Sequence, residues 1–405
     1  MYDKASLALI PSGTKAGTLY SVLPANGDGD FDFTRATSAT RVNKDGLIES
    51  VASGVPRLDY PLIDGVVQDC PALLLEPTRT NLSTNSEAFD SWTNGGTYVT
   101  ANQTVSPDGN TTADQLSKTA AFQQIQNTAT VVSGSTYSFS VFVKENTLDR
   151  ITLRLASGSN DVRKCLDLSD LSVTNAGGNQ TGFVETKVEQ YPNGWYKYTV
   201  VATSNGTTQY VNIYAGNATV TESGNIYIWG AQLELGNYPT SYIPTTTSSV
   251  TRNADECNGA GTSAEFNDNE GVLYAEIEAL GVDSSYRQIT IGNSTDNIKI
   301  LFNASSTRLR GLLKVGGINQ ADLFDETQTE IKYLKIALKY KSGDFALWVN
   351  GIEKDTATSG NIPTGMAEIA FDDGGGASDF YGKCKDLRVY DTALSDSELQ
   401  ALTTI

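Results

Sequence analysis

The chain has 405 residues, a formal net charge of −18 at pH 7, and no histidine. Its length and its hydrophobic content of 39 % predict two or three globular domains with packed cores, rather than one domain or a disordered chain. The acidic balance argues against nucleic-acid and anionic-membrane partners, and the missing imidazole removes the commonest general base and metal ligand, so we do not expect an enzyme.

Residues 1–75 are rich in Gly, Asp and Pro and contain few clean strand patterns. We interpret them as an extended N-terminal arm that serves for attachment. Polar and acidic residues alternate over residues 26–32 like the start of a calcium loop, but an EF-hand loop counted from Asp28 would have Phe33 and Ala39 where Gly and Glu are needed. A solvated acidic turn fits better. No basic segment with a long apolar run begins the chain, and no apolar run of about 18 residues occurs in it, so neither a secretory signal nor a membrane span is expected.

Residues 76–255 alternate apolar and polar side chains with a period of two. Ile151, Leu153 and Leu155, for example, are separated by Thr152 and Arg154. Half-buried antiparallel strands give this pattern because successive side chains point to opposite faces of a sheet. Turn signals such as Pro-Asn-Gly at residues 192–194 separate these segments, so the region is predicted to form a β-sandwich.

A Thr/Ser-rich run at residues 245–251 leads into a second region, residues 262–405, that shows the same alternation, most clearly over residues 334–340. The one convincing helix is at the C-terminal end, where Ser395 and Glu398 form a capping box. The predicted fold class is therefore all-β: an N-terminal extended arm followed by two antiparallel β-sandwich domains.

The four cysteines are widely separated and form no CxxC pair that would suggest zinc: Cys70, Cys165, Cys257 and Cys384. We expect free thiols, as in a protein made in a reducing cytoplasm.

A set of phrases in the first region is specific when taken together. They are LLEPTRTNL at residues 74–82, NSEAFDSWT at 85–93, NGWY at 193–196, IYIWGAQLE at 226–234 and TSYIPT at 240–245, with FTRATSATRV upstream at 33–42. Together they resemble the jelly-roll domain of bacteriophage head-spike, head-fibre and tail-fibre proteins, which looks like a carbohydrate-binding module. The resemblance covers about residues 30–255.

The second region contains WVNG at residues 348–351 and DLRVYDTALSDSEL at 386–399. A final strand that leads into a short capped helix resembles the concanavalin/laminin-G-like fold. This resemblance covers about residues 262–405 and implies a sandwich that binds glycan or protein.

The two resemblances imply a structural virion protein, a head or tail spike or fibre, made in the bacterial host cytoplasm. On this hypothesis residues 1–75 contact other virion proteins, and the sandwiches adhere to host cell-surface polysaccharide. Such fibres are commonly trimeric, so a homotrimer is expected. Two alternatives stay open: a polysaccharide depolymerase on the same particle, and a purely architectural capsid decoration.

Exposed aromatic side chains are candidates for glycan contact, because a sugar ring stacks its C–H face on an indole or phenol. Trp195 and Trp348 both fall on the polar side of their strand patterns, and Trp92 lies near a Gly-Gly turn. We predict these three residues as the glycan-binding aromatics, against the alternative that they pack under loops or against a neighbouring subunit.

An acidic, glycine-rich loop is the candidate metal site. Asp372, Asp373 and Asp379 lie in it, and the resemblance to laminin-G-like sandwiches implies that such a loop can bind calcium. The alternative is a mobile surface loop. No other cofactor is expected.

One acidic pair tests the depolymerase alternative. Glu276 and Glu278 lie on one face of a predicted strand about 7 Å apart, within the range of a glycosidase pair. Some concanavalin-like glycanases carry a third acid where this chain has Gly281. We therefore assign no catalytic residue, and interpret the pair as a solvated strand face.

Overall fold

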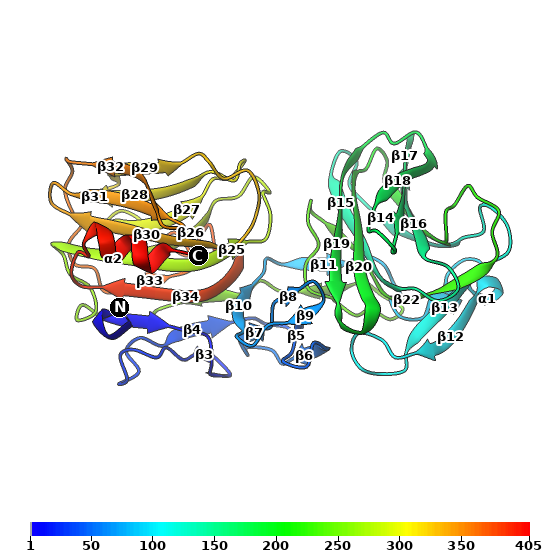
Figure 1. Ribbon diagram of the computed structural model, residues 1–405, viewed down its shortest axis with the longest axis horizontal. Coiled ribbons are helices and arrows are strands. Elements are labelled where there is room, and N and C mark those ends of the chain that lie inside the picture. Colours follow the sequence, from blue (N-terminus) through cyan, green and yellow to red (C-terminus); the bar gives the residue numbers. More distant parts are fainter. Residues whose placement is uncertain (1) are drawn as a thin grey trace.

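The structure is a computed structural model and describes residues 2–405. Two antiparallel β-sandwiches lie side by side, with N-terminal strands below and between them (Figure 1). The predicted all-β class with two sandwiches is confirmed. Within the described residues, no helix is both long enough and apolar enough to cross a membrane.

The first sandwich consists of two sheets, which we call sheets I and II. Sheet I has the order β12 (Val99–Thr104), β13 (Ala113–Lys118), β22 (Gly224–Leu235), β15 (Thr136–Lys144), β20 (Trp195–Thr203) and β19 (Phe183–Tyr191). Sheet II has the order β14 (Ile125–Thr130), β21 (Thr208–Ala215), β16 (Arg150–Ser157), β17 (Asn160–Asp167) and β18 (Val173–Gly178). Alternate side chains such as Phe139, Leu153 and Val200 fill the space between the sheets. This is the period-two burial that the sequence predicts.

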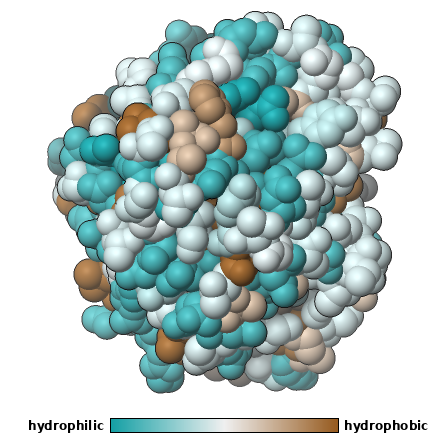
Figure 2. Space-filling model, turned by 90° about the vertical axis from the view of Figure 1, so that its right-hand side faces the viewer, coloured by the Kyte–Doolittle hydropathy of each residue, from teal (hydrophilic) through white to brown (hydrophobic). Residues whose placement is uncertain are grey.

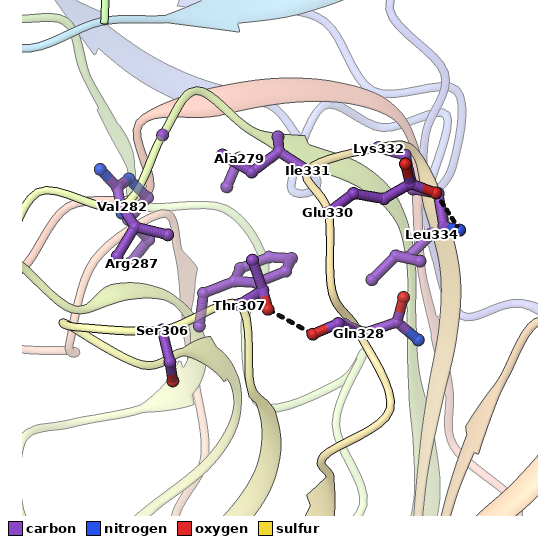
Figure 3. Close-up of a pocket in the computed structure, with 12 residues that line it drawn as sticks. Ala279, Val282, Arg287, Ser306, Thr307, Gln328, Glu330, Ile331, Lys332 and Leu334 are labelled. Atoms are coloured by element: carbon purple, nitrogen blue, oxygen red, sulfur yellow. Dashed lines mark hydrogen bonds and ion pairs between the residues drawn. The ribbon is translucent and has the colours of Figure 1, made fainter. Parts of the chain in front are cut away.

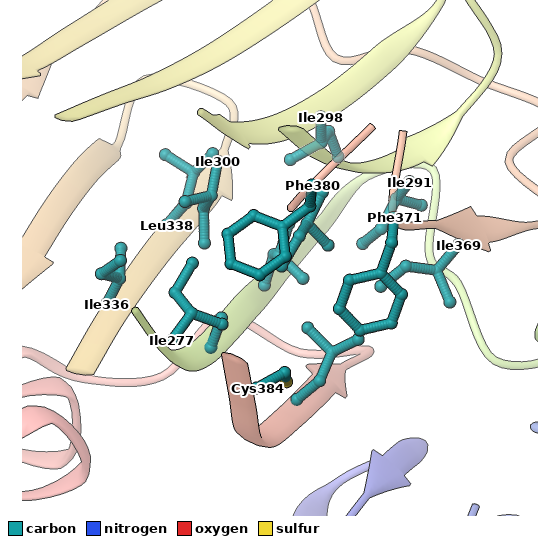
Figure 4. Close-up of a cluster of buried hydrophobic side chains, with 14 of the residues drawn as sticks. Ile277, Ile291, Ile298, Ile300, Ile336, Leu338, Ile369, Phe371, Phe380 and Cys384 are labelled. Atoms are coloured by element: carbon teal, nitrogen blue, oxygen red, sulfur yellow. The ribbon is translucent and has the colours of Figure 1, made fainter. Parts of the chain in front are cut away.

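The second sandwich consists of sheets III and IV. Sheet III has the order β32 (Ile352–Ala357), β31 (Phe345–Val349), β30 (Leu334–Lys341), β25 (Glu270–Ala279), β34 (Gly382–Tyr390), β10 (Ala72–Leu75) and β7 (Arg57–Asp59), and β1 (Leu7–Leu9) also pairs with β34. Sheet IV has the order β29 (Ile318–Asp325), β28 (Leu309–Val315), β27 (Asn297–Phe302), β26 (Arg287–Gly292) and β33 (Ile369–Ala370). Figure 4 shows part of the core between them, where Ile277, Ile300 and Phe380 are fully or almost fully buried.

The N-terminal region is not an extended arm, so that prediction is wrong. Strands β1 and β10 are antiparallel to β34 with Leu7 opposite Val389 and Leu73 opposite Cys384. Leu7, Leu9 and Leu73 are completely buried in the core of the second sandwich. These strands are only three or four residues long and pair with residues more than 300 positions later in the sequence. A local pattern search cannot detect such pairing.

The remaining elements are short. They are the sheet of β2 (Thr14–Lys15), β3 (Thr18–Leu19), β4 (Phe31–Thr34) and β24 (Glu256–Asn258), the pairs β5 (Ala39–Val42) with β6 (Ile48–Val51), β8 (Leu62–Ile63) with β9 (Val66–Val67) and β11 (Arg79–Asn81) with β23 (Val250–Arg252), the helices α1 (Gly95–Tyr98) and α2 (Asp396–Thr403), and the 3-10 turns η1 (Tyr2–Lys4), η2 (Phe89–Ser91) and η3 (Pro192–Gly194). Helix α2 begins with the predicted capping box of Ser395 and Glu398 and packs Leu399 and Leu402 against the outer face of sheet III.

A buried network of charged side chains joins the N-terminal region to both sandwiches. Arg57 of β7 donates a hydrogen bond to Glu76 at 2.5 Å and another to Asp255. Arg252 contacts Glu76 at 2.7 Å, and Arg35 contacts Asp255 at 2.9 Å. All five side chains are at most 2 % exposed. Because buried charges are tolerated only when they are paired, the sequence segments that carry them must stay together.

Candidate functional site

The three tryptophans predicted to contact glycan are all buried, so that prediction is wrong. Trp195, Trp348 and Trp92 are 2 %, 8 % and 4 % exposed. Trp195 and Trp348 do lie on the outer faces of their sheets, but those faces are covered. Trp195 belongs to a buried cluster that includes Ile48, and its Nε1 donates to the Val105 carbonyl at 3.1 Å, while helix α2 covers Trp348. Period-two alternation gives the face of a side chain, not what packs on that face.

The predicted calcium loop uses its carboxylates for its own turns. Asp372 accepts hydrogen bonds from the Gly374 amide and from the Asn258 side chain, and Asp373 accepts from two amides of the loop. Asp379 accepts from the Tyr381 hydroxyl at 2.8 Å. Nowhere in residues 2–405 do three or more Asp, Glu or Cys side chains form a group that could hold a metal ion. The structure therefore does not support the calcium prediction.

A small cavity lies at one end of the second sandwich (Figure 3). It is bordered by Ala279, Arg287 and Leu334, and by a loop in which Lys332 pairs with Glu330 at 2.8 Å. Its volume is ≈ 10 Å³, which is about the space that one water molecule needs. A sugar cannot enter it.

A much larger cleft, ≈ 790 Å³ in volume, lies between the two sandwiches. Its walls are the outer faces of sheets I and III, and the β8–β9 segment borders it. On β19 the side chains at alternate positions, Lys187, Glu189 and Tyr191, line one wall, and Glu278 of β25 lines the other. Because side chains two residues apart share a sheet face, one strand presents a row of polar groups to the cleft.

Each wall of the cleft carries an ion pair. Lys187 Nζ lies 3.2 Å from Glu189, and Lys383 Nζ of β34 lies 2.9 Å from Asp59 of β7. Burial by itself raises the pKa of Glu189, but the ammonium groups of Lys187, Lys197 and Lys383 outweigh it and lower this pKa to about 2. Glu189 is therefore a carboxylate at neutral pH.

Glu278 differs from Glu189, because it takes part in no ion pair among residues 2–405. Burial raises its pKa above the ordinary value, and the more distant Lys383 and Lys187 only partly offset this effect. The side chain is half-buried. It is thus a hydrogen-bonding group of the cleft that the protein leaves available.

Tyrosines supply the apolar surface of the cleft. Tyr60, Tyr191 and Tyr333 line it and are each half-buried. Lys385 Nζ lies 3.8 Å from the centre of the Tyr333 ring, and the Tyr333 hydroxyl has no hydrogen-bond partner in the described chain. Rings beside charged groups give both a stacking surface and directional hydrogen bonds.

Three solved structures show a limited similarity to this chain. The CBM40 of the Ruminococcus gnavus IT-sialidase is 18 % identical, with 34 % of this chain and 84 % of that chain covered and a TM-score of 0.30. Domains LG4-5 of the mouse laminin alpha1 chain are 11 % identical, with 69 % and 91 % covered and a TM-score of 0.25. The Trypanosoma rangeli sialidase with the inhibitor DANA is 11 % identical, with 95 % and 67 % covered and a TM-score of 0.29. No curated protein sequence matches.

The C-terminal part of the chain matches a known protein family. Residues 263–400 match the family Laminin_G_3, described as the concanavalin A-like lectin/glucanases superfamily. This segment is similar to the members of that superfamily. The match agrees with the resemblance seen in the sequence and includes β25 and β34, which form one wall of the cleft.

Sequence reasoning missed most of the cleft. Of the acidic pair on β25, the structure brings only Glu278 into the cleft between the two sandwiches, while Glu276 lies outside it. Lys187, Glu189 and Lys383 were not predicted. Their alternation on strands was a usable signal, but such charges usually mark a solvated face, and only the packing of two sandwiches makes them converge.

Proposed function

We propose that this protein binds glycan in the cleft between its two sandwiches. The observation that carries the proposal is the meeting of paired charges, a free carboxylate and tyrosine rings in one cleft of ≈ 790 Å³. Sugar hydroxyls both donate and accept hydrogen bonds, so they suit ion pairs such as Lys187–Glu189, and sugar C–H faces suit tyrosine rings. The volume lies in the range of about 300–1,000 Å³ that is usual for ligand sites.

The biological setting that we propose is a phage virion spike or fibre that adheres to host-surface glycan. The phrases in residues 30–255 and the lectin-superfamily match of residues 263–400 support it. Weak sites become effective when a particle displays many copies, because multivalency raises the local concentration of sites. In this setting residues 1–75 contact other virion proteins through a folded surface rather than an arm, and the assembly is a homotrimer.

Binding of the full chain to an array of bacterial and host polysaccharides tests the proposal. Glu278→Gln is the test variant, and Glu276→Gln is its matched control, because it changes the same residue type on the same strand outside the cleft. We expect binding by the unaltered chain, a loss of about tenfold or more for Glu278→Gln, and no change for Glu276→Gln. Absence of binding to any glycan would favour the purely architectural role.

A second candidate function is polysaccharide hydrolysis, which one observation favours. Glu189 and Glu278 line the same cleft from different sandwiches, and their surroundings move their pKa values in opposite directions. Two carboxyl groups whose pKa values differ in this way can act as the general acid and the general base of hydrolysis. Incubation of any bound glycan with the chain, followed by mass spectrometry, separates the two functions: shorter products that Glu278→Gln does not form would indicate a depolymerase.

A further inference from the structure

A hydrogen-bonded row of polar side chains crosses four strands of sheet II on its outer face. Arg163 of β17 lies opposite Arg154 of β16, which lies opposite Asn212 of β21, which lies opposite Gln126 of β14. Arg154 Nη1 donates to the Asn212 Oδ1 at 3.0 Å, and Asn212 Nδ2 donates to the Gln126 Oε1 at 3.0 Å. The neighbouring residues on these strands point into the core. Because successive side chains of a strand point to opposite faces, the side chains of the row point outward.

The row begins with an unusual pairing of like charges. Two cations directly opposite each other in a sheet repel one another, and here a single carboxylate, that of Asp161, bridges them. Arg154 Nε donates to it at 2.7 Å, and Arg163 donates to it through Nε and Nη2 at 3.1 and 2.7 Å. Two guanidinium groups and one carboxylate leave a local positive charge on a chain whose net charge is −18.

Both guanidinium groups keep unused donors. Within residues 2–405, Arg154 Nη2 and Arg163 Nη1 form no hydrogen bond, and the two side chains are 20 % and 18 % exposed. Their orientation is fixed by Asp161, so a ligand that reaches them need not order two long, flexible side chains. Preorganised donors of this kind bind oxyanions at a low entropic cost.

An exposed ring completes the surface. Tyr210 is two residues before Asn212 on β21, on the same face, and is 41 % exposed. It lies opposite Ala156, whose small side chain leaves the ring uncovered from that strand. Figure 2 views the end of the molecule that the first sandwich forms; hydrophilic and neutral colours predominate, and apolar residues occur in small separate groups. A ligand on this end therefore meets mainly polar groups.

We propose that this row is a second binding site and that it takes a carboxylate-bearing sugar. The planar carboxylate of the sugar would accept hydrogen bonds from Arg154 and Arg163. The sugar ring would stack on Tyr210, and the sugar hydroxyls would form hydrogen bonds with the Gln126 amide. A guanidinium fork matches a carboxylate, and the adjacent ring selects a sugar over a bare anion. The site does not depend on the cleft, because sheets I and II turn opposite faces to the outside.

Calorimetric titration of the full chain tests the proposal. The probes are oligosaccharides of glucuronate and of N-acetylneuraminate, a neutral glucose oligosaccharide of equal length, and inorganic phosphate. We expect the carboxylated sugars to bind and the neutral one to bind at least tenfold more weakly. Arg154→Gln should weaken binding about tenfold to a hundredfold, as expected for the loss of a charged hydrogen bond, while Arg163 still holds Asp161.

Two control variants test whether the loss of binding is specific to this site. Arg310 forms the same forked pair with Asp322 on the second sandwich, at 3.1 and 2.7 Å, so Arg310→Gln should leave binding unchanged. Tyr210→Ala should weaken binding, whereas Tyr286→Ala, which removes another exposed tyrosine, should not. Equal affinity for phosphate and for the carboxylated sugars, equal losses in the Arg310 control, or no binding of either carboxylated probe would each overturn the proposal.

Discussion

Arg57 and Asp255, 198 residues apart in the sequence, form an ion pair in which neither side chain has any exposed surface. Glu76 also forms an ion pair with Arg57. The pKa of Glu76 shows which interactions stabilise the cluster. Burial alone raises this pKa, but Arg252 and Arg57 outweigh burial and lower it far below the ordinary value. Glu76 also lines the cleft. The network therefore holds the two cleft walls in one arrangement.

Arg57→Leu should destabilise the protein by about 3 kcal/mol or more, because it leaves two buried carboxylates with fewer positive partners. Urea unfolding monitored by tryptophan fluorescence measures the loss. Arg150→Leu is the control: its pair with Asp167 is 44 % exposed on the arginine side, so its removal should change stability by at most about 1 kcal/mol. Equal effects of the two changes would contradict a structural role of the network.

Leu9→Ala should destabilise the second sandwich by about 2–5 kcal/mol, because Leu9 is fully buried and its truncation leaves a cavity. A free arm would show no such loss. Ile318→Ala, at a position that is 69 % exposed, should stay within about 0.5 kcal/mol of the unaltered chain. Thermal unfolding of the two variants side by side decides whether residues 2–75 belong to the fold.

Trp348→Ala should lower stability by about 3–5 kcal/mol and leave glycan affinity unchanged, because the indole lies under helix α2 and not in the cleft. Stability comes from urea unfolding, and affinity from binding assays on the folded fraction. A variant of normal stability that had lost its glycan affinity would restore the original stacking hypothesis for this residue.

The Glu189 carboxylate should titrate near pH 2, and Glu278 should titrate above the ordinary glutamate pKa. A pKa that is lower in the folded than in the unfolded state stabilises the fold above the unfolded value, and this contribution disappears as the pH falls toward 2. Carbon-13 NMR titration measures both groups. Lys187→Gln should raise the pKa of Glu189, because Lys187 is the nearest cation. An unchanged midpoint would show that the pairing is absent in solution.

Cys70 should be the cysteine that iodoacetamide modifies in the native protein. It is exposed, whereas Cys165, Cys257 and Cys384 are buried and burial raises the pKa of each of these thiols. Mass spectrometry should find one added group in the native chain and four after unfolding. Native modification of Cys70→Ser at the same level would contradict this prediction.

The sequence by itself determined the class of fold and, in the strands with clear alternation, which side chains share a face. The alternation at residues 151–155 and 334–340 is a property of neighbouring side chains on one strand, so it needs no partner to be recognised. The capping box at Ser395 was predictable for the same reason, since its two hydrogen bonds join residues three positions apart.

Only the tertiary structure decided which outer faces are covered and which are open. Trp195 and Trp348 have the alternation of outward residues, yet Trp195 is buried in a cluster with Ile48, and helix α2 covers Trp348. Leu7 and Leu73 belong to strands too short to recognise, and they pair with β34 from the far end of the chain. The cleft exists because two sheet faces meet, and contacts between distant segments are set by packing, which no local pattern encodes.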